Sequence, residues 1–126
     1  MKRLLVLLIT SILAVCLIVG CRGEVEVYVE TEDTINTRVG QEFVIALDSN
    51  PTTGYDWEES HDSAVLCLVE SRYTPDEEKP GLVGAGGTQY YRFRGLKAGT
   101  TEITVVYKRA WETEIAEQKV FKVDIE

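Results

Sequence analysis

Apolar and polar residues alternate with a period of two along most of the chain after residue 24, as they do in half-buried β-strands. Each alternating segment places a set of apolar side chains on one face. The sets are Val25, Val27 and Val29; Phe43, Ile45 and Leu47; Tyr91 and Phe93; Ile103, Val105 and Tyr107; and Phe121, Val123 and Ile125. The segment AVLCLVE (64–70) is apolar on both faces, which predicts a central strand. The only helical candidate, TEIAEQ (113–118), is short and bounded by strand-like sequence.

Turn-forming residues separate these segments at intervals of about ten residues, the spacing typical of an all-β sandwich. Val39-Gly40 and 97–100 have the composition of tight turns, whereas 49–57 and 74–87 are longer connections. The pattern predicts an all-β fold, an immunoglobulin-like β-sandwich of roughly six to seven strands. Because the paired cysteines of antibody domains are missing, its core must hold by apolar burial alone.

The first 20 residues differ in composition from the rest. Lys2 and Arg3 precede an apolar run that stops at Cys21, the layout of a secretory signal peptide. An uncleaved anchor is the alternative, because the run approaches spanning length. However, Ile18-Val19-Gly20-Cys21 resembles the lipobox of bacterial lipoproteins, in which the cysteine is lipid-modified and becomes the first residue.

We therefore expect a lipoprotein signal peptide over 1–20, lipidation at Cys21 with a short lipid-anchored tether over 21–24, and a folded domain over 25–126. This organisation implies an exported protein held at a membrane, on the periplasmic or cell-surface side.

The chain is acidic, with 13 basic and 21 acidic residues and a formal charge of −8. Residues 1–20 contain two basic residues and no acidic ones, so the remainder carries 11 − 21 = −10. Such a domain should repel nucleic acid and anionic lipid, and its field would favour a basic partner. Alternatively, the negative charge serves only to keep a tethered domain soluble.

Candidate catalytic and metal-binding groups are sparse. Cys67 alone remains once Cys16 leaves with the signal and Cys21 takes the lipid, so no disulfide framework is available. Cys67 lies among apolar residues, which favours an inert core position. A nucleophile pair with His61, the single histidine, would lack an oxyanion site and an orienting third group. One histidine and one cysteine also argue against zinc, so we expect no enzyme, no metal and no cofactor.

The segment NPTTGY (50–55) has the chemistry of a rigid turn. Pro51 fixes its own φ and pushes Asn50 out of the helical region, while Gly54 can take a positive φ. Thr52 and Thr53 are then held at the tip with their hydroxyls free to donate or accept. A well-made turn without further function is the alternative.

Two further connections are unusual. Residues 81–87 contain four glycines, which lets another backbone approach closely. A phosphate-binding loop would need a helix after the glycines, and it is disfavoured because a strand-like segment follows them. A plain flexible loop is the remaining alternative. Trp111 lies in the connection YKRAWE (107–112), where an exposed indole often anchors a contact, unless it folds back on the sandwich. In an immunoglobulin-like topology, connections at these positions can emerge at one end.

Three segments together resemble the chagasin family of cysteine-protease inhibitors: NPTTGY at 50–55, GLVGAGGTQYYRF from 81, and LKAGTTEITVVYKRAWE at 96–112. The resemblance covers essentially the whole domain after the signal. Family members are immunoglobulin-like sandwiches whose three loops form a wedge that enters the active-site cleft of papain-like proteases. It therefore implies a monomeric, reversible, tight-binding inhibitor of such proteases. An immunoglobulin-like surface module that binds protein or carbohydrate is the alternative.

The resemblance also implies a role for individual residues. Thr52 and Thr53 would reach the catalytic cysteine and histidine of the target. The protease-binding set it implies is Asn50, Pro51, Thr52, Thr53, Gly54, Tyr55, Gly84, Gly86, Gly87, Arg109 and Trp111. The sequence departs from the family pattern at Ala110, where proline is common, and mildly at Tyr55, where phenylalanine is frequent. We expect Ala110 to cost loop rigidity, of order 0.4–1 kcal/mol.

Overall fold

The computed structural model describes residues 25–76 and 86–126, so the signal peptide and tether predicted over 1–24 lie outside the described residues. The strands are β1 (Glu26–Tyr28), β2 (Ile35–Thr37), β3 (Glu42–Ser49), β4 (Tyr55–Ser60), β5 (Leu66–Pro75), β6 (Gly87–Gly95), β7 (Gly99–Arg109) and β8 (Ile115–Ile125). A single 3-10 turn, η1 (Pro51–Thr53), joins β3 to β4. The expected six or seven strands are thus six long ones plus β1 and β2, which have three residues each. The helical candidate at 113–118 is part of β8 and the loop before it.

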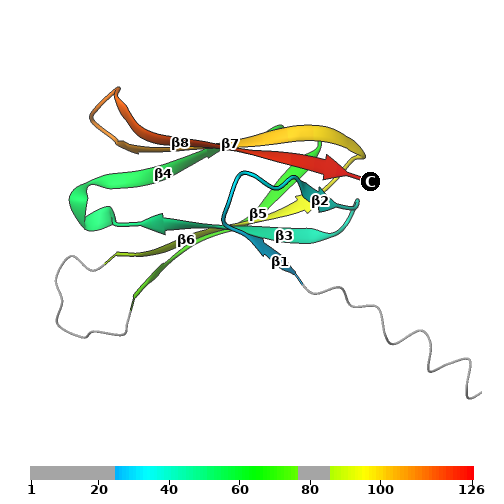
Figure 1. The fold of residues 1–126 in the computed structure, drawn as a ribbon, viewed down its shortest axis with the longest axis horizontal. Coiled ribbons are helices and arrows are strands. Elements are labelled where there is room, and N and C mark those ends of the chain that lie inside the picture. Colours follow the sequence, from blue (N-terminus) through cyan, green and yellow to red (C-terminus); the bar gives the residue numbers. More distant parts are fainter. Residues whose placement is uncertain (1–24, 77–85) are drawn as a thin grey trace, which may run out of the picture.

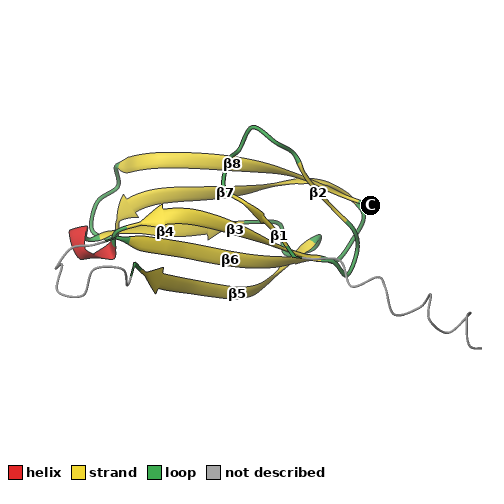
Figure 2. Ribbon diagram, turned by 60° about the horizontal axis from the view of Figure 1, so that its bottom comes forward, coloured by secondary structure: helices red, strands yellow, loops and turns green. Residues whose placement is uncertain are grey.

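Two four-stranded sheets pack face to face, with strand orders β1-β3-β6-β5 and β2-β8-β7-β4 (Figures 1 and 2). The long strands pair antiparallel, whereas β1 joins β3 and β2 joins β8 in parallel. The predicted all-β sandwich is confirmed. Within the two described ranges, no helix is long and apolar enough to cross a bilayer.

The core consists of the inward-facing side chains of both sheets. It is made of Ile35, Phe43, Ile45, Leu47, Trp57, Leu66, Tyr91, Phe93, Ile103, Val105, Phe121, Val123 and Ile125. Burial of each large side chain contributes roughly 1.5–3 kcal/mol. The polar atoms of its two large amphipathic side chains form hydrogen bonds: Trp57 Nε1 donates to Asp48 O (2.8 Å), and Tyr91 Oη donates to Trp57 O (3.1 Å). The alternation in the β3, β6, β7 and β8 segments therefore predicted the buried faces correctly.

The N-terminal strand turns a different face inward than its valines suggest. Val27 is 56% exposed, whereas Tyr28 packs edge-on against Phe43 with ring centroids 6.3 Å apart. Parallel pairing places Tyr28 opposite Ile45, and therefore on the core side of the sheet. An aromatic ring at the edge of the core buries more apolar area than a valine would.

The prediction that AVLCLVE forms a central strand is wrong. It begins β5, which lies at an edge of its sheet and pairs only with β6. Leu66 is fully buried, but Val69 is 41% exposed beside a bulge between Leu68 and Glu70. Cys67 is only partly buried and lies opposite Arg94 of β6, so the expected core position is wrong as well.

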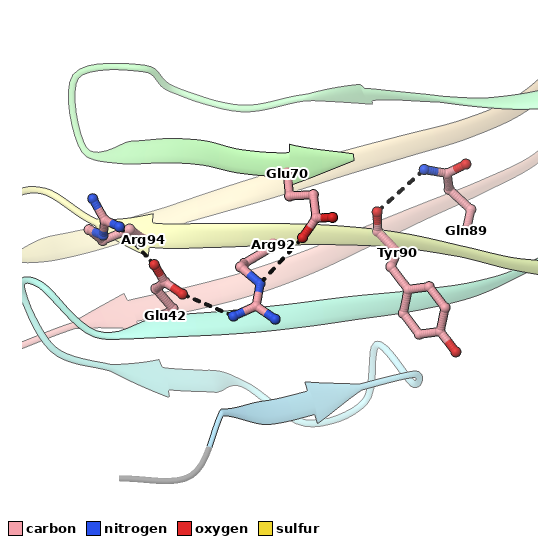
Figure 3. Close-up of polar contacts among 6 residues, drawn as sticks. All are labelled: Glu42, Glu70, Gln89, Tyr90, Arg92 and Arg94. Carbon is pink, nitrogen blue, oxygen red and sulfur yellow. Dashed lines mark hydrogen bonds and ion pairs between the residues drawn. The ribbon is translucent and has the colours of Figure 1, made fainter. Parts of the chain in front are cut away.

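Charged residues form a connected row on the outer face of the β1-β3-β6-β5 sheet (Figure 3). Glu42 accepts from Arg94 Nη2 at 2.7 Å and from Arg92 Nη1 at 3.1 Å. Arg92 Nε also lies 3.8 Å from a carboxylate oxygen of Glu70. The two guanidinium groups, that of Arg94 first, hold the pKa of Glu42 below its usual value. We call these four residues the charged face.

Candidate functional site

The turn between β3 and β4 has the rigid geometry that its sequence predicts. Asn50 has φ −137° and ψ 82°, outside the helical region, and Pro51 opens the 3-10 turn. Gly54 closes it with φ 83° and donates its N–H to Pro51 O at 3.0 Å. Thr53 N donates to Asn50 O at 3.2 Å. Proline and glycine therefore fix the two ends of the tip, as expected.

The threonine hydroxyls are not free, which corrects the expectation. Thr52 Oγ1 donates to Asn50 Oδ1 at 2.5 Å, and Thr53 Oγ1 donates to Asn50 O at 2.7 Å. Both residues are exposed, and each hydroxyl oxygen keeps lone pairs that can accept. Asn50 thus orients both side chains, and the tip presents them mainly as acceptors.

The connection between β7 and β8 folds against this turn. A Cβ built on Gly54 would lie 2.4 Å from Cη2 of Trp111, so the indole edge rests directly on the glycine. Arg109 Nε donates to Thr53 O at 3.3 Å. Trp111 nevertheless stays 72% exposed, so it is not folded back on the sandwich. The two turns form one continuous surface because only a glycine at position 54 lets the indole approach.

Arg109 is held by aromatic rings and by one carboxylate. Its guanidinium carbon lies 4.4 Å from the ring centroid of Tyr55 and 5.9 Å from that of Trp111, and Nη1 donates to Glu112 Oε1 at 3.3 Å. Glu112 N also donates to Arg109 O at 3.1 Å, which closes the turn around Ala110. Sequence analysis missed Glu112, although its position directly after Trp111 was a usable signal.

A stack of rings connects this surface to the core. Tyr107 lies between Tyr55 and Trp57, with centroid separations of 5.3 and 4.8 Å. Its hydroxyl accepts a hydrogen bond from Asn50 N at 3.0 Å. The first turn is therefore supported from β7 as well as from its own proline, which keeps its ordering cost low.

Gly86 and Gly87, the described residues of the glycine-rich segment, lie at the same end of the molecule. Gly87 pairs with Ser49, and a Cβ on Gly86 would lie 2.9 Å from Ser49 O. A Cβ on Gly87 would lie 2.3 Å from Thr74 O. In this part of the segment the backbone that approaches the glycines is the chain's own. The other predicted glycine, Gly84, lies outside the described residues.

The predicted convergence of the three segments is confirmed for the residues that the structure describes. We call residues 50–55, 86–87 and 109–112 the loop edge. Figure 1 shows the β3–β4 and β7–β8 connections at the end of the sandwich opposite the C-terminus and the start of β1, and Figure 2 agrees. Whether each residue contacts a partner stays a prediction.

The alternative chemistry of His61 and Cys67 is not supported by their positions. His61 Nδ1 lies 2.7 Å from Glu59 Oε2, and its ring packs edge-on against Phe93, a core residue. Cys67 of β5 lies opposite Arg94 of β6, on the outer face of the sheet to which Phe93 belongs. Among residues 25–76 and 86–126, no group of three or more His, Cys, Asp or Glu side chains could hold a metal ion.

Comparison with known proteins gives a consistent result. The model of the chagasin family peptidase inhibitor I42 matches residues 36–125. Amoebiasin-1 of Entamoeba histolytica is 36% identical over 85 residues, covering 64% of this chain and 81% of that protein. Chagasin of Trypanosoma cruzi is 37% identical over 84 residues, covering 62% and 74%. The crystal structure of the cysteine protease inhibitor EhICP2 from Entamoeba histolytica superposes with a TM-score of 0.68 at 25% identity, covering 82% of this chain and 99% of that one.

Proposed function

Because the chain belongs to the chagasin family of peptidase inhibitors, we propose that it inhibits papain-like cysteine proteases by inserting the loop edge into their active-site cleft. The protein is an inhibitor and not an enzyme, and its binding is reversible and tight. The observation that carries the proposal is the contact between Trp111 and Gly54, which joins two distant turns into one exposed edge.

The turn geometry explains how the edge can occupy a cleft without being cut. A protease needs an extended peptide bond whose carbonyl carbon is open to attack. In the 3-10 turn, Asn50 O and Pro51 O instead accept hydrogen bonds from Thr53 and Gly54. The tip is therefore curled and internally bonded, and withholds the alignment that bond cleavage requires.

Affinity in this proposal comes chiefly from Trp111 and from preorganisation. A tryptophan that is 72% exposed in the free protein offers a large apolar area to a partner surface. Arg109 is already bonded to Thr53 O, so little side-chain entropy remains to be lost on binding.

We further propose that the inhibitor is exported and anchored to a membrane by lipid at Cys21. A tether of residues 21–24 could extend at most about 14 Å. The loop edge lies at the opposite end from β1, so the proposed anchor would leave it pointing away from the bilayer (Figure 1). Lipid on Cys21 should be detected by mass spectrometry, and Cys21→Ala should abolish both the lipid mass and the removal of residues 1–20.

The direct test of function uses purified residues 22–126. They should form a 1:1 complex with papain or a cathepsin and inhibit it at concentrations below about 1 μM, the range of specific protein complexes. Absence of inhibition at tens of micromolar, on the order of 30 μM, would refute the proposal.

A further inference from the structure

An open hollow adjoins the loop edge between the two sheets. It has a volume of about 390 Å³ and is bounded by the end of β3, the residues that flank the glycine-rich segment, and β7 and β8. Its wall includes Asn50 and Gly86, so it opens beside the surface proposed to enter the protease. A volume of this size corresponds to roughly a dozen water molecules, and hence to one large side chain with its hydration.

The hollow is acidic. Asp76 and Glu117 contribute carboxylates from two separate segments, whereas the side chain of Asp48 alternates with that of Ser49 and points to the outer face of its sheet. Lys119 lies 3.8 Å from a carboxylate oxygen of Glu117 and offsets part of this charge. These three side chains therefore carry −2 + 1 = −1, at one end of a domain whose residues 21–126 carry −10.

A buried hydroxyl in the wall of the hollow lacks a partner among the described residues. Ser49 is 5% exposed, and no group in residues 25–76 or 86–126 forms a hydrogen bond with its Oγ. Its side chain faces the space between the sheets, as that of Leu47 does two residues earlier, and Ser49 also contributes to the lining. Leaving such a hydroxyl unpaired costs stability, which an incoming donor would restore.

These features match a long cationic side chain better than a metal ion. In the described part of the chain, no three acidic or other ligating side chains are close enough to hold a metal. Lysine and arginine only donate hydrogen bonds, and their several N–H groups can reach two separated carboxylates and a hydroxyl at once.

We propose that this acidic hollow receives a lysine or arginine side chain from the rim of the target protease. The inference rests on the proposed function and adds to it a partner class, namely papain-like proteases with a basic residue beside the active-site cleft. Charge pairs at the rim of an interface act mainly on the association rate and its salt dependence.

The test measures association rates with two papain-like proteases, one of net positive and one of net negative charge at the assay pH. The double variant Asp76→Asn/Glu117→Gln should associate about five- to tenfold more slowly with the basic protease at low salt, and this difference should shrink at ~0.5 M salt. Lys119→Gln should have the opposite effect and accelerate association about twofold. The rate with the acidic protease should not fall in the double variant.

A matched control carries the same charge change at the far end of the sandwich. Glu102→Gln/Asp124→Asn should leave both association rates within about twofold of the parent, because exposed charges more than a Debye length away are screened. Equal effects of the two double variants, or no effect of either, would overturn the proposed role of the hollow even if the protein still inhibits the protease. Failure of the parent protein to inhibit any papain-like protease would instead overturn the proposed function, and the hollow's role with it.

Discussion

Arginines occupy two regions of this domain in contrasting environments. On the loop edge, Arg109 lies over the rings of Tyr55 and Trp111 and donates to a backbone oxygen of the neighbouring turn. On the charged face, Arg92 and Arg94 converge on the carboxylate of Glu42. Arg109 is the last paired residue of β7 and connects the turns beyond the β4–β7 ladder, whereas Arg92 and Arg94 make their contacts with Glu42 within the β3–β6 ladder.

The difference concerns what each arginine holds in place. Strands β3 and β6 pair along their whole length, so the charged face adds little to their position, and half-exposed ion pairs contribute at most about 1 kcal/mol. On the loop edge, the ladder between β4 and β7 ends at the pair Tyr55–Arg109, and the turn residues beyond this pair belong to no ladder. Beyond that pair, the guanidinium of Arg109 and the contact between Gly54 and Trp111 hold the exposed parts of the two turns together, so changes there should affect binding more than stability.

The largest expected effect comes from removing the tip and the anchor of the loop edge together. Thr53→Ala with Trp111→Ala should weaken inhibition by at least about 100-fold, because truncating central contacts costs about 2 kcal/mol or more each. The melting temperature should change little, since both side chains are exposed. Inhibition kinetics and calorimetry measure the two quantities.

The matched control truncates exposed residues at the opposite end, Leu96→Ala with Thr100→Ala. It should leave the inhibition constant within about twofold, as surface changes away from an interface do. Full inhibition by the Thr53/Trp111 variant would instead favour a surface-binding module that does not use this edge against proteases.

Two glycines with nearly the same positive φ allow the effect of backbone strain to be measured separately from that of the contact with Trp111. Gly54 has φ 83° and meets Trp111, whereas Gly40 has φ 84° and nothing within 4 Å of its Cβ position. Alanine at either site should cost about 1–2 kcal/mol of unfolding free energy through its left-handed conformation. Only Gly54→Ala should also displace the indole and weaken inhibition, by roughly tenfold or more.

Equilibrium denaturation and inhibition assays on Gly54→Ala and Gly40→Ala check this separation. Equal loss of inhibition in both variants would show that the loop edge responds to general destabilisation and not to the contact with Trp111.

Replacing arginine by lysine tests the comparison at constant charge. Arg109→Lys removes the planar group that lies over Tyr55 and reaches Thr53 O, so inhibition should weaken about fivefold to tenfold. Arg94→Lys on the charged face should leave the inhibition constant unchanged and alter stability only slightly. A binding defect in Arg94→Lys comparable to that of Arg109→Lys would contradict the division of roles.

Making the β7–β8 turn more rigid should have a smaller effect than the changes above, and it should strengthen inhibition instead of weakening it. Ala110 follows Arg109 in the turn closed by the bond from Glu112 N to Arg109 O, the position where proline is favoured in common β-turns. Ala110→Pro should therefore tighten inhibition about two- to fivefold, the equivalent of about 0.4–1 kcal/mol. Dissociation rates would reveal the change, and weaker binding would mean that the proline ring does not fit this turn.

Much of the fold followed from the alternation of side chains, and its failures have physical causes. Long strands with one buried face, such as β6 and β8, show a period of two that reports that face. The edge strands do not, because the pairing of β1 with β3 turns Tyr28 and not Val27 toward the core, and a bulge in β5 breaks the alternation after Leu68.

The loop edge was predictable only in part. Proline and glycine carry their own backbone preferences, so the turn at 50–55 could be derived from local chemistry. The contact of Trp111 with Gly54, which lies 57 residues earlier in the chain, depends on how two turns meet in space, and the directions of the threonine hydroxyls depend on Asn50. The acidic hollow brings together residues from three segments, and nothing local marks them as neighbours.

The smallest expected effect is the pH dependence of the charged face. The pKa of Glu42 is lowered in the folded protein by Arg94 and then Arg92, so its contribution to stability is present above its unfolded pKa, near 4.5, and is lost as the pH falls through the lower folded value. Glu42→Gln should therefore be less stable than the parent at pH 7, by no more than about 1 kcal/mol, and the difference should close between about pH 5 and 3. Denaturant titrations at pH 7 and at about pH 3 measure it. Inhibition by Glu42→Gln should match the parent throughout, because this face is not part of the loop edge; a shared loss of binding would mean that the two regions are coupled.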